Sequence, residues 1–180
     1  MIGTIPGILY EEGFLPEEAQ VFAWAVRAVR WDERIRARKT ASFGQPYNYA
    51  GLSYPPLPFP RELEQIRARV AERLAAPYNN CLLNYYPDGS SRMGFHSDSA
   101  EGIVHGAGVA IVSLGAQRSL RFRRTAALDE RLDYVLAPGS LLFMAPEVQQ
   151  EWQHSLPRTS RPAPRISLTF RAVTLPPVTS

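Results

Sequence analysis

The stretch Arg165-Ile166-Ser167-Leu168-Thr169-Phe170-Arg171 alternates polar and apolar residues over its whole length. Successive side chains of a β-strand point to opposite faces, so this pattern predicts a strand whose apolar face packs on a core. The opposite face carries both arginines and is expected to line a wet cavity. The two arginine Cα atoms would lie roughly 20 Å apart, and their long side chains can lean together to bracket a small dianion or a carboxylate. A strand with solvated arginines would show the same alternation.

Five more stretches of strand length precede this one, and turn signals such as Pro87-Asp88-Gly89 and Pro138-Gly139 separate several of them. So many short strands in succession predict a β-sandwich or a barrel. The five stretches are 81–86, 108–114, 119–123, 133–136 and 140–144.

Two helices are predicted before the strands, and each is expected to begin at or just after a proline. The first follows Pro16 and the second follows Pro60. The fold class is therefore mainly β with flanking helices (α+β), with two N-terminal helices packed outside one sheet. The apolar stripes expected to face the core are Phe22, Ala25, Val26 and Val29 in the first helix, and Leu63, Ile66, Val70 and Leu74 in the second.

The size and composition of the chain restrict the class of protein. Its 180 residues fit one domain, and 45% hydrophobic with 21% charged residues excludes a disordered chain. No apolar stretch reaches the roughly 18 residues of a membrane span, and the N-terminus lacks the basic start of a secretory signal. The single cysteine, Cys81, excludes an internal disulfide and a zinc-finger cage. We expect a monomeric, cytoplasmic protein.

The basic residues are almost all arginine and are unevenly placed. The formal net charge is +3, and Lys39 is the one lysine among 20 basic residues. Arginines gather at 27–39, 118–124 and 158–171, and the last two runs hold no acidic residue. Such asymmetry indicates a polyanionic partner, although a solvated face would give the same runs.

The histidines suggest a metal site. In an extended segment the side chains of His96 and Asp98 share a face, close enough to bind one ion together. If His154 joins them, two histidines and one carboxylate form a facial triad that leaves coordination positions open on iron(II). The alternative is a surface His-x-Asp pair and an unrelated buried histidine. His105 has no partner at ligand spacing and is interpreted as a loop residue.

The segment Asn84-Tyr85-Tyr86 adds two candidate hydrogen-bonding groups. By strand parity Asn84 and Tyr86 share one face, and both can bond an anionic ligand. A tyrosine-rich strand that packs its core is the alternative.

These elements, in this order, resemble the AlkB family of iron(II)- and 2-oxoglutarate-dependent dioxygenases. The resemblance spans about residues 36–173, and the ordered combination is more specific than any one motif. The matching pieces are Asn84-x-Tyr86-x-Asp88-Gly89, His96-x-Asp98, Val112-Ser113-Leu114-Gly115, Pro138-Gly139-Ser140-Leu141-Leu142, His154-Ser155-Leu156-Pro157 and Pro164-Arg165-x-Ser167-Leu168-Thr169-Phe170-Arg171.

The resemblance implies a double-stranded β-helix (jelly-roll, cupin-like) core at about 78–173, within a single domain spanning 1–180. It implies that the iron ligands are His96, Asp98 and His154. It further implies that Arg165 pairs with the distal carboxylate of 2-oxoglutarate, and that Arg171 lies near the metal-side carboxylates. The remaining co-substrate contacts implied are Asn84, Tyr86 and Ser167, the last at a position where many members have asparagine.

The segment at about 36–55 looks like the nucleotide-recognition lid of the DNA-repair members. There Tyr47 and Tyr49 match aromatic positions that contact the flipped base, and stacking of a base on such a ring contributes about 1–3 kcal/mol. The substrate-binding residues expected on this basis are Arg38, Tyr47, Tyr49, Ser99 and Glu101. Repair members usually have an acid one or two positions after the metal aspartate, where this chain has Ser99 and Ala100.

The function implied is removal of alkyl groups from bases of the 1-methyladenine and 3-methylcytosine type in DNA, using Fe(II), 2-oxoglutarate and O₂. One alternative is the same chemistry on RNA or on a protein side chain. A second is a jelly-roll module that binds nucleic acid without catalysis. An intact triad argues against the second.

Overall fold

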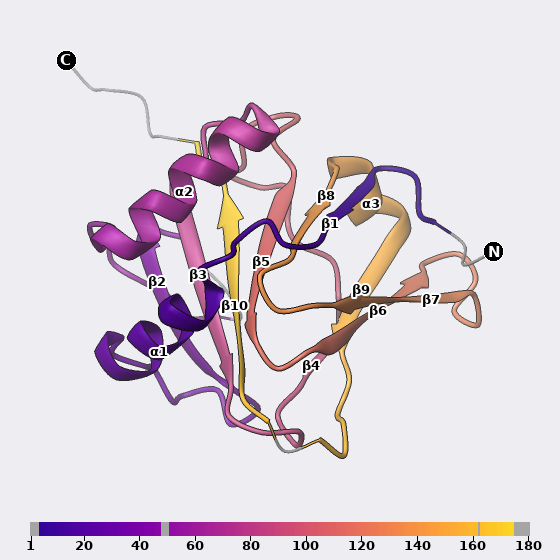
Figure 1. Cartoon of the computed structure of the whole chain (residues 1–180). Coiled ribbons are helices and arrows are strands. Elements are labelled where there is room, and N and C mark those ends of the chain that lie inside the picture. The colour runs from indigo at the N-terminus through magenta and orange to yellow at the C-terminus, as the bar shows by residue number, and fades with distance from the viewer. Residues whose placement is uncertain (1–3, 48–50, 162, 175–180) are drawn as a thin grey trace.

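Two antiparallel sheets face each other in the computed structural model, which describes residues 4–47, 51–161 and 163–174 (Figure 1). The larger sheet has six strands in the order β1-β8-β5-β10-β3-β2. Its strands are β1 (Ile8–Glu11), β2 (Lys39–Gly44), β3 (Asn80–Tyr86), β5 (Val109–Gly115), β8 (Leu141–Met144) and β10 (Arg165–Arg171).

The smaller sheet has four strands in the order β4-β9-β6-β7. These are β4 (Met93–His96), β6 (Arg118–Arg124), β7 (Arg131–Leu136) and β9 (Trp152–Leu156). From β3 onward the chain crosses between the sheets at every connection except that from β6 to β7. This is the jelly-roll arrangement expected from the resemblance.

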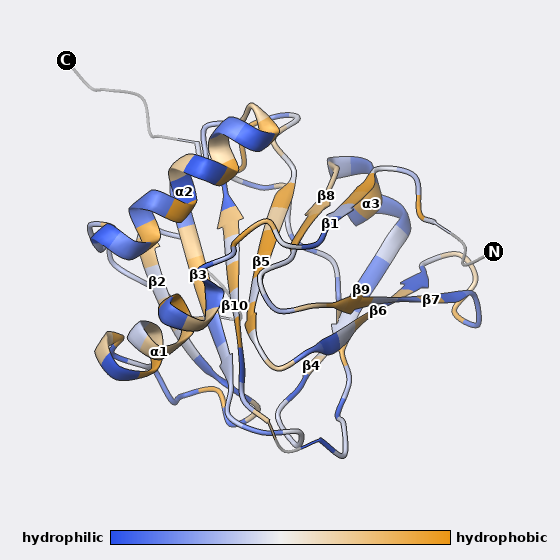
Figure 2. Ribbon diagram, viewed as in Figure 1, coloured by the Kyte–Doolittle hydropathy of each residue, from blue (hydrophilic) through white to orange (hydrophobic). Residues whose placement is uncertain are grey.

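Helices α1 (Glu18–Ala28) and α2 (Arg61–Leu74) cover the outer face of the larger sheet (Figure 1). Their buried residues pack with the outward-facing residues of β3, β5 and β10 in one apolar core. In Figure 2 β5 is mostly apolar, whereas α2 alternates between polar and apolar stretches. Such alternation is typical of a helix with one face on a sheet and one in water.

A second core fills the space between the sheets. It contains Ile111 from the larger sheet and Leu120 and Phe122 from the smaller one, all buried. Toward β10 this inner layer becomes polar, because Arg165, Ser167, Thr169 and Arg171 point inward. The central strand therefore separates an apolar outer core from a polar inner cavity.

The predicted strands and both predicted helices are present, and the fold class is confirmed. One detail of the first helix was wrong: Val26 is 41% exposed, and Val21 is buried with Ala25 instead. Val21 and Ala25 lie about one turn apart on the buried face of the helix, whereas Val26 is rotated about 100° from Ala25.

Four short strands and one short helix escaped the sequence analysis. The strands β1, β4 and β9 have five residues or fewer and no clear alternation, and β2 is the first part of the segment interpreted as a lid. Helix α3 (Pro146–Glu151) has six residues, too few for a periodic stripe. Among the described residues, no helix is long and apolar enough to span a membrane.

Candidate active site

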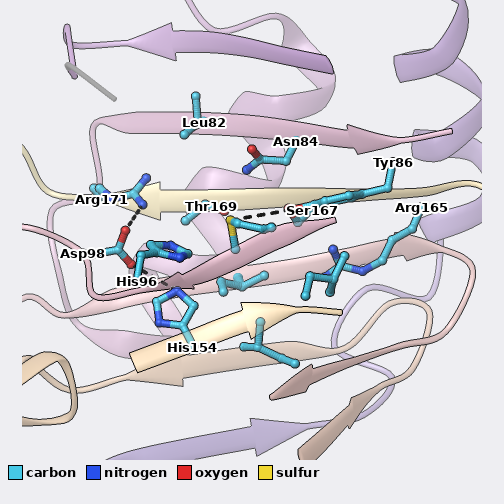
Figure 3. A pocket seen from close by; sticks show the side chains of 14 residues that line it. Leu82, Asn84, Tyr86, His96, Asp98, His154, Arg165, Ser167, Thr169 and Arg171 are labelled. Carbon is cyan, nitrogen blue, oxygen red and sulfur yellow. Dashed lines mark hydrogen bonds and ion pairs between the residues drawn. The ribbon is translucent and has the colours of Figure 1, made fainter. Parts of the chain in front are cut away.

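Three side chains with metal-binding atoms meet where β4 and β9 pair. His96 lies directly opposite His154 in the register of these strands, with ring centroids 4.3 Å apart. Asp98 follows two residues after His96, and its Oδ2 lies 3.7 Å from Nε2 of His154. One ligand atom from each residue lies within 4.8 Å of the other two, so the group can hold one metal ion (Figure 3).

The Asp98 carboxylate is buried and held from two sides. Arg171 Nη2 donates to Oδ1 at 2.7 Å. Gln149 of α3 accepts a hydrogen bond from the Asp98 backbone N–H at 2.9 Å, and its Nε2 lies 3.5 Å from Oδ2. Burial by itself raises the pKa of Asp98, but the charges of Arg171 and the two histidines lower it to about 2. The group is therefore ionised, as a metal ligand must be.

The two histidines also favour the forms that bind metal. Burial lowers the pKa of His154 to about 4, although Asp98 opposes this. His96 Nδ1 lies 2.9 Å from the carbonyl oxygen of Gly94. Donation to a carbonyl assigns the proton to Nδ1, which leaves the Nε2 lone pair for a metal ion.

At the other end of the same cavity lies Arg165, 2% exposed. Its Nη2 donates to Ser113 Oγ at 3.0 Å, and its guanidinium carbon lies 5.5 Å from the ring centroid of Tyr86. Its Nε is buried and has no hydrogen-bond partner among the described residues. Burial lowers the pKa of Arg165 to about 10, so the side chain remains charged at neutral pH. A buried cation with an unsatisfied donor fits an incoming carboxylate.

The wall between these ends is set by the neighbours of β10. Ser167 pairs in register with Asn84 on β3 and with Ser113 on β5. Asn84 Oδ1 accepts a hydrogen bond from Arg38 Nε at 2.8 Å. That bond fixes the orientation of the amide and directs its NH₂ group away from Arg38. The cavity thus has a carboxylate and two imidazoles at one end and hydrogen-bond donors at the other (Figure 3).

Comparison with known proteins agrees with this site. Residues 15–171 match the family described as the 2OG-Fe(II) oxygenase superfamily. The chain is 35% identical over 172 residues to mouse "DNA oxidative demethylase ALKBH2", a match that covers 88% of the chain and 72% of that protein. The chain belongs to the AlkB family of 2OG-Fe(II) oxygenases.

Two further matches support the same family and fold. Bovine "DNA oxidative demethylase ALKBH2" is 36% identical over 172 residues, covering 88% of the chain and 62% of that protein. The solved structure titled "The structure of OsALKBH1" superposes with a TM-score of 0.71, covering 94% of the chain and 99% of that structure. At 17% identity the latter shows the fold alone.

The AlkB-family chain is therefore a dioxygenase that uses Fe(II), 2-oxoglutarate and O₂. The residues in hand fit these groups. The triad supplies imidazole and carboxylate, the donor set of non-haem iron(II) oxygenases. The unsatisfied Nε of Arg165 supplies a donor for a dicarboxylate.

The substrate-side residues predicted for this oxygenase are dispersed. Tyr47 lies at the metal end, where the Arg171 guanidinium carbon is 4.4 Å from its ring centroid, and burial raises its pKa. Arg38 is buried, donates to Asn84 and is not part of the lining of the cavity that holds the triad. Ser99 and Glu101 are exposed on the turn after Asp98, outside the cavity lining.

Tyr49 lies outside the described residues. The backbone N–H of Glu101 donates to Ser99 Oγ at 3.1 Å, so Ser99 and Glu101 belong to one local turn.

The sequence analysis assigned no role at the oxygenase site to Gln149 or Ser113, which contact Asp98 and Arg165. Gln149 lies on α3, a helix that the sequence pattern did not predict. Ser113 is the one residue with a polar side chain in the otherwise apolar strand β5. Arg118 was counted as part of a basic run, yet it is buried and donates to the carbonyl oxygens of Ser91 and Pro157. Only Ser113 carried a signal, since a hydroxyl inside the run 109–114 breaks an otherwise apolar strand.

Proposed function

We propose that this chain removes alkyl groups from N-alkylated nucleobases in DNA, with His96, Asp98 and His154 as the iron ligands. The observation that carries the proposal is the pairing of this triad with a buried arginine at the opposite end of one cavity. The relatives named DNA oxidative demethylases support the substrate class.

Iron(II), with O₂ and 2-oxoglutarate, supplies the oxidation of an N-alkyl carbon, after which the group leaves the base as an aldehyde. The protein contributes orientation and a protected cavity. Three protein ligands leave open positions at the metal for the co-substrate, O₂ and the base. Arg171 holds Asp98 in its ionised, ligand-ready form.

The far carboxylate of 2-oxoglutarate is assigned to Arg165, with Tyr86 and Asn84 as further donors and Ser167 beside them. Tyr86 now donates its hydroxyl to Met93 Sδ at 3.9 Å, a weak contact that a carboxylate oxygen can replace. The free volume of the cavity is about 20 Å³, roughly that of one water. We therefore expect Met93, a flexible side chain, to move when the co-substrate binds.

The base is assigned to the metal end, where Tyr47 forms part of the entrance. Its aromatic face lies on the guanidinium of Arg171, which connects it to the metal carboxylate. Stacking of an extruded base on such a ring contributes about 1–3 kcal/mol. The segment 36–55 is proposed as the lid, with Tyr49 as its second aromatic contact, and Ser99 and Glu101 as contacts made once the base has entered.

The surface arginines are consistent with a polyanionic partner, and the three basic runs of the sequence differ in how many of their arginines are paired with carboxylates. Arg121 pairs with Asp133 at 2.8 Å, and Arg124 lies 3.4 Å from Glu130, so two of the four arginines of the run 118–124 are neutralised by carboxylates. A second set of exposed arginines forms no ion pair with any described carboxylate, and most of its members line one surface cavity of about 380 Å³. This set, which we call the unpaired arginine cluster, consists of Arg36, Arg92, Arg158 and Arg161.

We further propose a single domain, acting as a monomer in the cytoplasm. The large apolar side chains exposed on the described part of the chain are scattered rather than contiguous. Scattered apolar residues do not form the patch that a stable dimer buries.

The test is a turnover assay with iron(II), 2-oxoglutarate and a single-stranded oligonucleotide carrying 1-methyladenine or 3-methylcytosine. We expect succinate, formaldehyde and repaired base to rise together. Succinate without repair would retain the dioxygenase and reject DNA as substrate, leaving RNA or a protein side chain. Neither product, with iron shown to be bound, would favour a non-catalytic binding module.

The substrate class has a separate test in the salt dependence of binding. Association with an oligonucleotide through several phosphates weakens steeply as salt rises. A shallow dependence would contradict the proposal that the unpaired arginine cluster contacts a nucleic-acid backbone.

A further inference from the structure

The metal carboxylate lies in a part of the chain that no strand ladder holds. β4 ends at His96, and the pairing of β4 with β9 is already irregular between Met93 and His96. Asp98 therefore lacks the cross-strand hydrogen bonds that fix the backbone of His96 and His154. Something else has to hold its backbone and its side chain.

Helix α3 supplies that support through one side chain. Gln149 Oε1 accepts the backbone N–H of Asp98 at 2.9 Å, and Gln149 Nε2 lies 3.5 Å from Oδ2 of the same residue. A single amide thus contacts both the main chain and the carboxylate of Asp98. Two contacts to one residue restrict its backbone and its side-chain rotamer together.

The oxygen that Gln149 approaches is the one that faces the histidines. Oδ1 is bonded to Arg171 at 2.7 Å, whereas Oδ2 lies 3.7 Å from Nε2 of His154. The two polar partners therefore contact different oxygens of the carboxylate: the Arg171 guanidinium contacts Oδ1, and the neutral Gln149 amide contacts Oδ2. A neutral donor orients Oδ2 without competing for it as strongly as a second cation would.

A second bond ties the same segment to the strand that carries His154. Ser97 Oγ donates to the carbonyl oxygen of Trp152 at 3.0 Å. Trp152 is the first residue of β9, directly after α3, and His154 is two residues further on. Successive residues 97 and 98 are therefore fixed to the α3–β9 junction, which sets Asp98 relative to His154.

We infer that Gln149 is a positioning residue that orients the Asp98 carboxylate for metal binding. The inference rests on the metal site of the proposed function. Partners that orient a metal ligand typically change metal affinity about 10–100-fold when they are removed. We expect a loss in that range when the amide of Gln149 is replaced by an apolar group.

The experiment is an anaerobic titration of the whole chain with Co(II), followed by visible absorption, without 2-oxoglutarate or nucleic acid. Gln149→Met keeps the length of the side chain and removes both contacts. Gln150→Met makes the same chemical change at the next residue of α3, which is exposed, whereas the described hydrogen bonds to Asp98 from this helix come from Gln149. The expected result is weaker Co(II) binding and an altered absorption band in Gln149→Met, with Gln150→Met like the wild type.

The outcomes separate this inference from the proposed metal site. If the wild type binds Co(II) and Gln149→Met binds it equally well, Gln149 is not a positioning residue, and the triad stands. If the wild type fails to bind while folded, the metal site itself is wrong and the inference falls with it.

A second variant guards against a folding defect. Gln149→Ala favours the helix by propensity, so it should fold and still lose affinity as Gln149→Met does. Wild-type Co(II) affinity in Gln149→Ala would overturn the inference. A second result would also overturn it: both variants lower the melting temperature of the metal-free protein, but their folded fraction binds Co(II) with wild-type affinity. Gln149 would then have a structural role alone.

Discussion

The two arginines of β10 lie at opposite ends of one cavity, and both are 2% exposed, yet their surroundings differ (Figure 3). Arg171 donates to the Asp98 carboxylate at 2.7 Å. Arg165 contacts the hydroxyl of Ser113 and the ring of Tyr86, neither of which carries a charge. Within the described part of the chain, Arg171 has a carboxylate partner and Arg165 has none.

The difference shows how a buried charge indicates function. Burying an ion costs several kcal/mol, and a paired partner offsets most of that cost. Arg171 has such a partner in Asp98, whereas the arrangement around Arg165 is satisfied only by an anion from outside. Since Arg165 stays charged near neutral pH, a dicarboxylate is the natural complement.

The largest expected effect comes from removing the partner of Arg171. Asp98→Ala deletes a proposed metal ligand, so we expect succinate formation to be abolished. It also leaves the Arg171 charge buried and unpaired, which should lower the free energy of unfolding by about 3–5 kcal/mol. Both quantities are measurable, by succinate release and by urea denaturation of the metal-free protein.

A control for this change is Asp129→Ala, which removes an exposed carboxylate. It should leave both quantities close to the wild type. Near-normal succinate formation in Asp98→Ala would reject the triad.

The charges at the Arg171 end should also appear in the pH dependence of stability. The pKa of His154 is lowered from 6.5 to about 4, so between these values the unfolded chain binds the extra proton. Stability of the metal-free protein is then complete above about pH 6.5 and falls as the pH drops to about 4, by about 3 kcal/mol. The lowered pKa of Asp98 continues the loss from its ordinary value of 3.8 down to about 2.

Urea unfolding at several pH values measures this loss, and His154→Gln should flatten the curve between pH 6.5 and 4. His105→Gln changes an exposed histidine and should leave the curve as it is. A wild-type curve that is already flat in this window would contradict the burial argument for His154.

At the other end, Arg165→Met separates binding from stability. Loss of charge-assisted hydrogen bonds worth about 1.5–3 kcal/mol should raise the KM for 2-oxoglutarate about 10–100-fold. Removing an uncompensated buried charge should leave the ligand-free stability unchanged or higher. Arg171→Met should instead lower stability, because Asp98 loses its cation.

Steady-state kinetics and urea denaturation of these two variants test the comparison directly. Equal destabilisation by both substitutions would show that Arg165 has a compensating partner after all. An unchanged KM in Arg165→Met would assign the far carboxylate to another residue.

The smallest expected effect extends the comparison to the surface. Arg158 belongs to the unpaired arginine cluster, whereas Arg121 is paired with Asp133. Arg158→Gln should reduce the slope of oligonucleotide affinity against salt by about one, and Arg121→Gln should leave it unchanged. Equal slopes would show that an unpaired arginine on this surface does not mark a phosphate contact.

The site was largely predictable because its residues lie on strands with a clear pattern. The alternation from Arg165 to Arg171 predicted which face is polar, and the structure confirms that the apolar residues Ile166, Leu168 and Phe170 lie in the outer core. The same parity brought Asn84 and Tyr86 to the cavity. Residue roles toward iron, 2-oxoglutarate and the base remain predictions that the experiments above test.

The contacts that the sequence did not predict join residues that are distant along the chain. Arg38 was assigned to substrate by its place in the lid segment, and its hydrogen bond to Asn84, 46 residues away, was not predicted. The run 118–124 was interpreted as a surface for a polyanion, yet Asp133 neutralises Arg121 from the neighbouring strand β7. Charge runs in a sequence do not show which carboxylates another strand will bring beside them.

The sequence by itself determined the alternation of β10, the His-x-Asp spacing and the amphipathic helices, because these follow from periods of 2.0 and 3.6 residues within one element. Only the tertiary structure decided which atoms of Arg171 and Gln149, 73 and 51 residues away, hold Asp98. It also decided that Arg165 has no carboxylate partner among the described residues. Such pairings depend on which strands the jelly-roll brings side by side. Because burying an unpaired charge is costly, each pairing strongly affects stability and ligand binding.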